Sequence, residues 1–161
     1  MYISKWWGNM TCGDTEDSTV LIDYFAMHNK KEYSLNEILK DAQLENALGK
    51  TPLHMHNSIE CYFWLGDLDS EDKYQVDIDI PINVVIDLGA LLLQTLVEEV
   101  VTIEDMTFSI SAEKDELKLI ISELQNAIKQ PELYYPDFLQ EEFAEMKDGI
   151  IEIYTHLERY C

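Results

Sequence analysis

The sequence predicts an α+β domain that is predominantly helical, with about five or six helices packed with a small antiparallel β-hairpin or sheet. Three observations lead to this fold class. Long segments repeat apolar residues at the helical period, one central segment alternates apolar and polar residues, and the 161-residue chain is 47% hydrophobic. A chain of this length and composition suits a single globular domain over residues 1–161.

Two helices are expected in the first third of the chain. Several N-cap candidates precede the apolar run that begins at Val20, which predicts a helix over residues 18–29. Ser34 stands three residues before Glu37 in a capping-box pattern, and apolar residues then recur at near-helical spacing as far as Gly49. The second predicted helix therefore runs from the Ser34 cap to Gly49.

The middle of the chain changes to a β-like pattern. Residues 59–65 are rich in aromatic side chains, residues 66–72 form an acidic turn-like stretch, and residues 74–80 alternate with a period of two. These runs predict an antiparallel hairpin whose second strand ends at Pro81 and directs Asp77 and Asp79 away from the core.

The second half is mainly helical. Residues 82–99 are apolar nearly all round, as expected of a buried central helix, and Asp87 and Gln94 are the polar residues in its interior. Short strands are expected over residues 100–103, which could instead continue the helix, and over residues 106–110. An amphipathic helix then begins at Ser111 or Ala112 and stops at Pro131. Pro136 and Gly149 frame two further predicted helices, over residues 138–146 and 150–160.

The charge of the chain indicates its partner. Thirty-two acidic residues against eleven basic ones give a formal net charge of −21. So large an excess on a compact body is self-repelling and exceeds what solubility needs, so the sequence predicts a cationic partner. Direct binding of nucleic acid is not expected, because its electrostatic footprint is basic. The N-terminus has no leader pattern and no apolar run reaches the ~20 residues of a membrane span, so we expect a soluble, cytoplasmic protein.

Motifs for catalysis and cofactor binding are absent from the sequence. It contains no phosphate-binding loop, dinucleotide fingerprint, nucleophile elbow or zinc-protease motif. Cys12, Cys61 and Cys161 are far apart and odd in number, so reduced thiols are expected. His54 and His56 lack a complete ligand set, and the acidic turn matches only part of a calcium loop. We therefore expect no metal, no cofactor and no catalytic residue.

Two rival surfaces are candidates for binding the partner. The first is the hairpin, whose ordered strands would present carboxylates rigidly and so limit the entropy lost on binding. The second is the N-terminal segment, where adjacent tryptophans could leave one indole exposed as an apolar anchor beside acidic residues. The hairpin candidates are Asp67, Asp69, Glu71, Asp72, Asp77 and Asp79, and the N-terminal candidates are Trp6, Trp7, Asp14, Glu16 and Asp17.

The N-terminal segment also resembles a known class of proteins. The resemblance rests on Trp7-Gly8-Asn9, the acidic stretch at residues 13–18 and the helix that contains residues 21–25, on a small acidic domain. These features are similar to those of the immunity proteins encoded beside bacterial contact-dependent or polymorphic toxins. The resemblance implies a role: neutralising a cognate toxin domain, often a basic nuclease, by tight binding in the cytosol of the producing cell.

The leading hypothesis is therefore an immunity-type inhibitor that occludes a basic toxin C-terminal domain electrostatically. Charge complementarity also accelerates association, which matters when the target is lethal. An acidic DNA mimic or other regulatory binding protein is an alternative, and it requires carboxylates spaced like phosphates. A small metal- or carboxylate-dependent hydrolase that uses Asp, Glu and His54 or His56 is the alternative from a different class.

Overall fold

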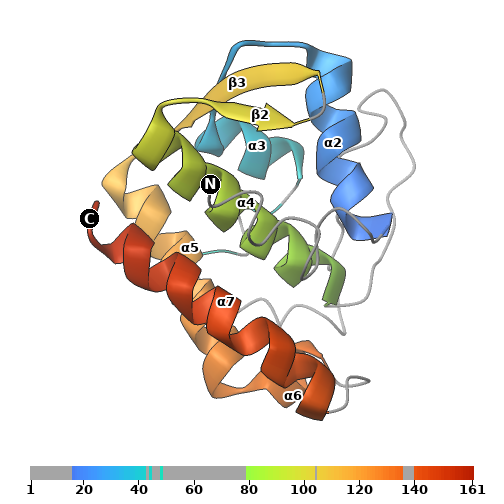
Figure 1. Ribbon diagram of the computed structural model, residues 1–161, viewed down its shortest axis with the longest axis vertical. Helices are drawn as coiled ribbons and strands as arrows, with labels where there is room; N and C mark the ends of the chain where they lie inside the picture. Colours follow the sequence, from blue (N-terminus) through green and yellow to red (C-terminus); the bar gives the residue numbers. More distant parts are fainter. Residues whose placement is uncertain (1–15, 43, 45–47, 49–78, 104, 136–139) are drawn as a thin grey trace.

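The computed structural model describes residues 16–42, 44, 48, 79–103, 105–135 and 140–161 (Figure 1). Over these residues the chain forms six helices and a small mixed sheet, which confirms the predicted α+β, mainly helical class. The elements in chain order are α2 (Glu16–His28), β1 (Glu32–Ser34), α3 (Leu35–Asp41), α4 (Asp79–Glu98), β2 (Val101–Ile103), β3 (Met106–Ser111), α5 (Lys114–Lys129), α6 (Pro131–Tyr134) and α7 (Gln140–Glu158).

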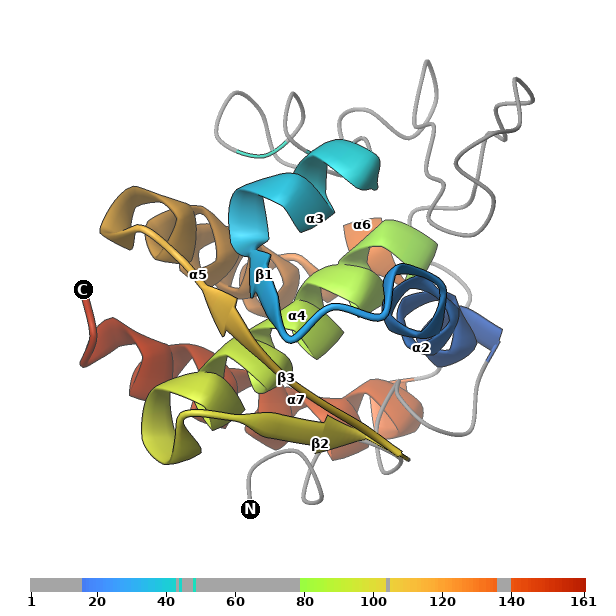
Figure 2. The same ribbon diagram turned by 90° about the horizontal axis from the view of Figure 1, so that it is seen from above.

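Helix α4 lies at the centre of the molecule, as its uniformly apolar sequence predicted (Figures 1 and 2). Every residue from 82 to 94 is buried, and the helix contacts α2, α5, α7, β2 and β3. A helix can be apolar on all sides only where neighbours cover every face. The remaining elements are therefore arranged around α4.

The sheet covers one side of α4 with a mixed arrangement of strands. Its order is β1-β3-β2, with β1 parallel and β2 antiparallel to β3. Tyr33 and Phe108 lie on its buried face, whereas Thr102 and Thr107 are exposed and their Oγ1 atoms lie 3.2 Å apart. The strands predicted over residues 100–103 and 106–110 are confirmed as β2 and β3. Strand β1 was not predicted.

An aromatic cluster joins the sheet to α2. The ring of Phe25 in α2 stacks on Phe108 in β3 with centroids 4.2 Å apart, and Tyr33 in β1 meets Phe25 edge-on at 5.0 Å. Such offset and edge-to-face pairs add stability beyond the area they bury. Helix α2 ends at His28, and the next residue, Asn29, has a φ of 48°, a left-handed conformation that Asn tolerates just after a helix.

The end of the predicted hairpin is wrong. Asp79 and Ile80, predicted as the last residues of a strand, are the first two residues of α4. Pro81 is therefore inside the first helical turn, where its missing N–H leaves no bond unmade. Proline here marks the beginning of a helix and not the end of a strand. Residues 59–65 and 74–78, the rest of the predicted hairpin, lie outside the described residues.

The C-terminal region also differs from the prediction. One continuous helix, α7, replaces the two helices that Gly149 was expected to separate, and Pro131 begins the short helix α6 immediately after α5. A glycine inside a helix costs about 1 kcal/mol relative to alanine. The buried face of α7 outweighs this cost, because its apolar residues keep helical spacing on both sides of Gly149: Phe143, Met146, Ile150, Ile153 and Leu157.

A close approach at Gly89 fixes the packing of α4 on its two long neighbours. A β-carbon at this position would lie 3.0 Å from Cγ2 of Ile153 in α7 and 3.4 Å from Cδ1 of Leu124 in α5. The first distance is shorter than an ordinary van der Waals contact. The absence of a side chain at Gly89 therefore lets three helices approach one another closely.

Replacing Gly89 with valine is expected to lower the free energy of unfolding by about 1–3 kcal/mol, because the added methyl groups overpack this contact. Helix propensity alone favours Val over Gly, so a loss of stability would report packing. Urea denaturation of the purified protein measures the change. The control is Ala144→Val at an exposed position of α7, expected to cost no more than about 0.7 kcal/mol. Equal losses in the two variants would contradict the packing account.

Candidate partner-binding surface

Three of the predicted partner-binding residues lie in described elements. Glu16 and Asp17 are the first two residues of α2, and Asp79 is the first residue of α4. The two helices pack together, and their N-terminal ends lie on the same side of the molecule in both views (Figures 1 and 2). Residues assigned by sequence to two rival surfaces thus begin neighbouring helices. The first turn of a helix also favours acidic residues through the helix dipole.

The other predicted candidates lie outside the described residues. These are Trp6, Trp7, Asp14, Asp67, Asp69, Glu71, Asp72 and Asp77, together with His54 and His56. In the part of the chain that is described, no three His, Cys, Asp or Glu side chains gather as metal ligands.

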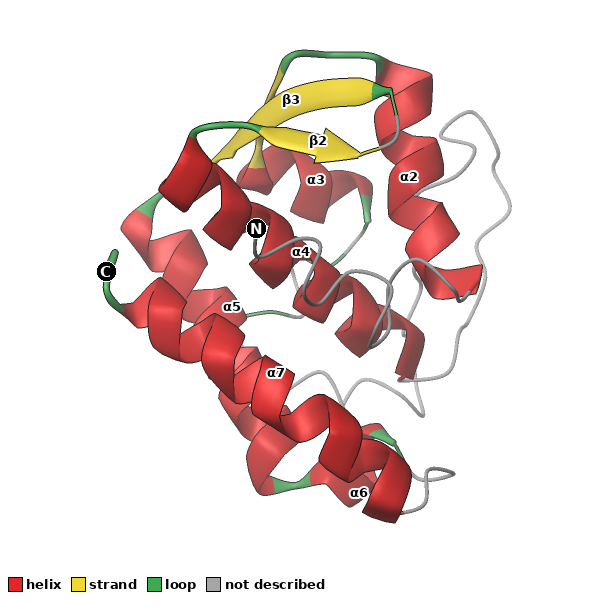
Figure 3. Cartoon of the chain, viewed as in Figure 1, coloured by secondary structure: helices red, strands yellow, loops and turns green. Residues whose placement is uncertain are grey.

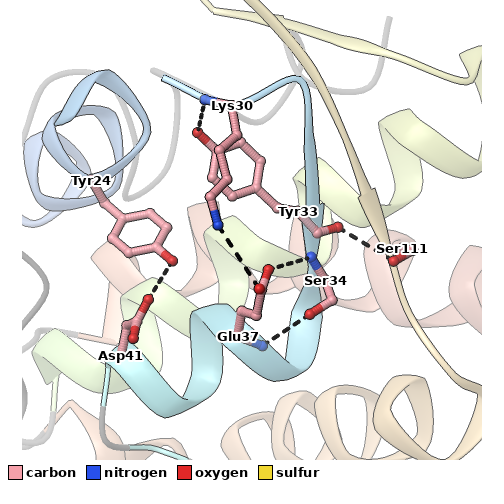
Figure 4. Close-up of polar contacts among 7 residues, drawn as sticks. All are labelled: Tyr24, Lys30, Tyr33, Ser34, Glu37, Asp41 and Ser111. Carbon is pink, nitrogen blue, oxygen red and sulfur yellow. Dashed lines mark hydrogen bonds and ion pairs between the residues drawn. The ribbon is translucent and has the colours of Figure 1, made fainter. Parts of the chain in front are cut away.

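Two acidic side chains of α3, Glu37 and Asp41, are engaged within the fold (Figure 4). Ser34 and Glu37 form the predicted capping box: the Glu37 N–H donates to Ser34 Oγ at 3.2 Å, and the Ser34 N–H donates to Glu37 Oε2 at 3.3 Å. Glu37 also pairs with Lys30 Nζ at 3.9 Å. The structural role of Glu37 is therefore to begin α3 and tie it to the loop after α2.

Two buried tyrosines donate to carboxylates and hold elements together. Tyr24 in α2 donates to Asp41 at the end of α3 at 2.6 Å, and Tyr134 in α6 donates to Glu123 in α5 at 2.7 Å. Burial raises the pKa of both phenols, and the neighbouring carboxylate raises each further. Both hydroxyls therefore stay protonated and continue to donate at neutral pH. Asp41 and Glu123 contribute to the fold through these bonds.

The junction of α4 and β2 presents a different arrangement, which the sequence reasoning missed. Val97 and Val100 are both 46% exposed, and Glu98 and Glu99 between them are also exposed. Neither glutamate forms an ion pair with a described Lys or Arg. The signal was present in the sequence, because two valines bracket two glutamates where a fully buried helix must end.

Hydrogen bonds from Gln94 and Thr95 fix the conformation of the junction between α4 and β2. The buried Gln94 side chain donates from Nε2 to Oε2 of Glu98 at 2.7 Å. Thr95 Oγ1 donates to the Leu91 carbonyl at 3.1 Å and accepts from the N–H of Ile110 in β3 at 3.4 Å. Glu99 then ends the helix in a left-handed conformation, with φ of 71°, and its N–H donates to the Thr95 carbonyl at 2.8 Å. A short loop leads into β2 (Figure 3).

The described part of the chain is thus an acidic, mainly helical α+β domain that presents exposed carboxylates and valines on a fixed scaffold. A sequence model of the family described as Immunity protein 68 matches residues 2–157, and the chain belongs to this family. The predicted resemblance to bacterial immunity proteins is thereby confirmed. No match was found among curated proteins or among solved structures.

Family membership supplies the coarse function. Immunity proteins bind a cognate toxin and neutralise it, and such families are generally not enzymes. Among the described helices, none combines the length and apolar character needed to cross a bilayer.

The raised pKa of the Tyr134 phenol is expected to make the stability of the protein depend on alkaline pH. Its pKa is raised in the folded chain above the ordinary value of 10.0, so its contribution to stability is complete below pH 10. Above pH 10 the unfolded chain releases this proton while the folded chain keeps it, and stability falls as pH rises.

Tyr134→Phe is expected to destabilise the protein at pH 7 by about 1–3 kcal/mol, because Glu123 loses a buried donor. The same variant should lose less stability than the parent between pH 9 and pH 11, a range set by the ordinary tyrosine pKa near 10. Denaturant titrations at several pH values measure both effects. Tyr160→Phe, at an exposed position, is the control. If the free energy of unfolding falls equally with pH in the parent and in Tyr134→Phe, the Tyr134 phenol does not contribute to the loss of stability at alkaline pH.

Proposed function

We propose that this chain protects the bacterium that makes it by occluding a basic domain of its cognate toxin in the cytoplasm. The observation that carries the proposal is a net charge of −21 in a member of an immunity family. A nuclease is the toxin class that best fits this charge. Nucleases hold phosphates with Lys and Arg, and an acidic protein competes for the same surface.

The electrostatics favour rapid capture of such a target. Complementary charge raises association rates by roughly 10- to 1,000-fold and disfavours wrong partners. A producing cell gains protection only if the inhibitor reaches the toxin before the toxin reaches its substrate. Delivery by contact-dependent growth inhibition is consistent with this need, because the recipient cell must already hold its inhibitor.

Co-expression tests the proposal directly. The reading frame immediately upstream of this one is expected to encode a protein with a basic C-terminal domain. Inducing that domain in a bacterial host should abolish colony formation, and co-expressing the present chain should restore it at least a hundredfold. An unrelated acidic protein of similar charge is the control. Failure of the present chain to protect, or equal protection by the control, would contradict a specific immunity role.

The second measurement concerns salt. Between roughly 50 and 500 mM salt the Debye length shrinks from about 14 Å to about 4 Å. The association rate of the two purified proteins should fall steeply over this range, while the dissociation rate changes much less. A salt-independent association rate would show that the charge serves a purpose other than steering.

The acidic turn is the first of the two surfaces that we propose for this contact. Changing Asp67, Asp69, Glu71 and Asp72 to Asn or Gln should weaken toxin binding by more than about 1.4 kcal/mol, a tenfold change in affinity. Stability should change little, because surface like-charge repulsion is relieved. Calorimetry with the toxin domain and thermal melting measure the two effects.

The rival N-terminal surface supplies the contrary outcome. If the variant of the acidic turn binds and protects like the parent, whereas Trp6→Ala or Trp7→Ala loses binding without unfolding, the N-terminal segment is the interface. The assignment to the acidic turn would then be wrong.

A further inference from the structure

We propose that the α4–β2 shoulder, defined as Val97, Glu98, Glu99 and Val100, is a contact surface for the cationic face of the cognate toxin. This inference rests on the proposed function and adds a surface made of residues that were not among the predicted candidates. It combines an apolar element with uncompensated negative charge on a fixed piece of backbone.

The apolar element is the first line of support. Val97 in the last turn of α4 and Val100 just after the helix are each almost half exposed, although residues 82–94 of α4 are all buried. Protein interfaces gain most of their affinity from apolar groups that lose water, surrounded by a polar rim. At the shoulder one valine lies on each side of two glutamates, so that apolar and charged groups adjoin on one exposed surface.

The negative charge of the shoulder indicates which kind of partner it binds. Glu98 and Glu99 are exposed and have no Lys or Arg partner within the described part of the chain. The negative charge repels nucleic acid and anionic membrane surfaces. A second copy of this chain would carry another −21, so self-association through the shoulder is disfavoured. A cationic protein surface is the occupant that this charge favours.

Preorganisation is the third line of support. The buried Gln94 amide holds the Glu98 carboxylate at 2.7 Å, and Thr95 ties the same helical turn to β3. A carboxylate that is already fixed loses less conformational entropy on binding than a free one. The shoulder can therefore form a charge pair at lower entropic cost than a mobile surface glutamate.

The test uses the full chain with the shoulder neutralised. The variant Val97→Thr, Glu98→Gln, Glu99→Gln and Val100→Thr keeps side-chain shape, β-branching at both valines and the capacity of residue 98 to accept from Gln94. The matched control is Glu132→Gln, Leu133→Asn and Glu141→Gln at α6 and the start of α7, which removes the same charge and an apolar side chain of comparable exposure. In Figure 1 these elements lie at the opposite end of the molecule from the sheet.

Surface plasmon resonance with the recombinant upstream-encoded toxin domain measures the rates, and thermal melting checks that each variant is folded. We expect the shoulder variant to raise the Kd at least tenfold and the control to stay within about twofold. The pair Glu98→Gln and Glu99→Gln should mainly slow association, whereas Val97→Thr and Val100→Thr should mainly speed dissociation.

Each other outcome overturns the inference in a recognisable way. If the parent binds and protects while the folded shoulder variant binds within twofold of it, the immunity role stands and the shoulder is not the contact. If shoulder and control variants weaken binding equally, only overall charge matters. If the shoulder variant unfolds, the double variant Glu99→Gln and Val100→Thr replaces it in the same assay, and a Kd within twofold of the parent then overturns the inference. If sedimentation shows a dimer that this variant abolishes, the occupant is a second copy. If the parent does not bind the toxin domain, the proposed function fails and the shoulder with it.

Discussion

Burial of α4 on all sides is the constraint on which the rest of the structure depends. Residues 82–94 are removed from water by elements from both halves of the chain. Polar groups inside such a helix need partners. Asn83 accepts from the Tyr135 hydroxyl at 2.6 Å, and Gln94 donates outward to Glu98. The hydrogen bond from Gln94 to Glu98 links the buried core to the surface, because it fixes the Glu98 carboxylate at the C-terminal end of α4.

Two sets of acidic residues in the described chain have different consequences. Glu37, Asp41 and Glu123 are bound to a cap, a lysine or a tyrosine hydroxyl and stabilise the fold. Glu98 and Glu99 are exposed without a described cation beside them. The first set lowers the energy of the folded state, whereas the second adds to its self-repulsion. A net charge of −21 is tolerable because the core supplies the stability, and the second set is available to the proposed partner.

The sequence predicted the elements whose signals are local. The apolar run of α4, the Ser34–Glu37 capping box and the amphipathic α5 each need only neighbouring residues to be recognised. Strand β1 is three residues long and exists through its parallel pairing with β3, more than 70 residues away, so no local period reveals it. Pro81 and Gly149 misled for a related reason. Proline is compatible with the first turn of a helix, which is where Pro81 lies. The unfavourable helix propensity of Gly149 is outweighed by burial of the apolar face of α7. Carboxylates could be counted from sequence, but the tyrosine partners of Asp41 and Glu123 could not be identified, because they lie 17 and 11 residues away.

The length of α4 separates the shoulder from the described candidates Glu16, Asp17 and Asp79. Asp79 begins the helix near the first residues of α2, and the shoulder ends it. Twenty residues at about 1.5 Å each place these ends about 30 Å apart. A standard interface of about 800 Å² on each partner extends only about 16 Å from its centre. A toxin of ordinary footprint centred on the shoulder therefore does not reach Glu16, Asp17 or Asp79. Losses of affinity at both ends would require a toxin that wraps along α4, and a loss at one end alone would locate the contact.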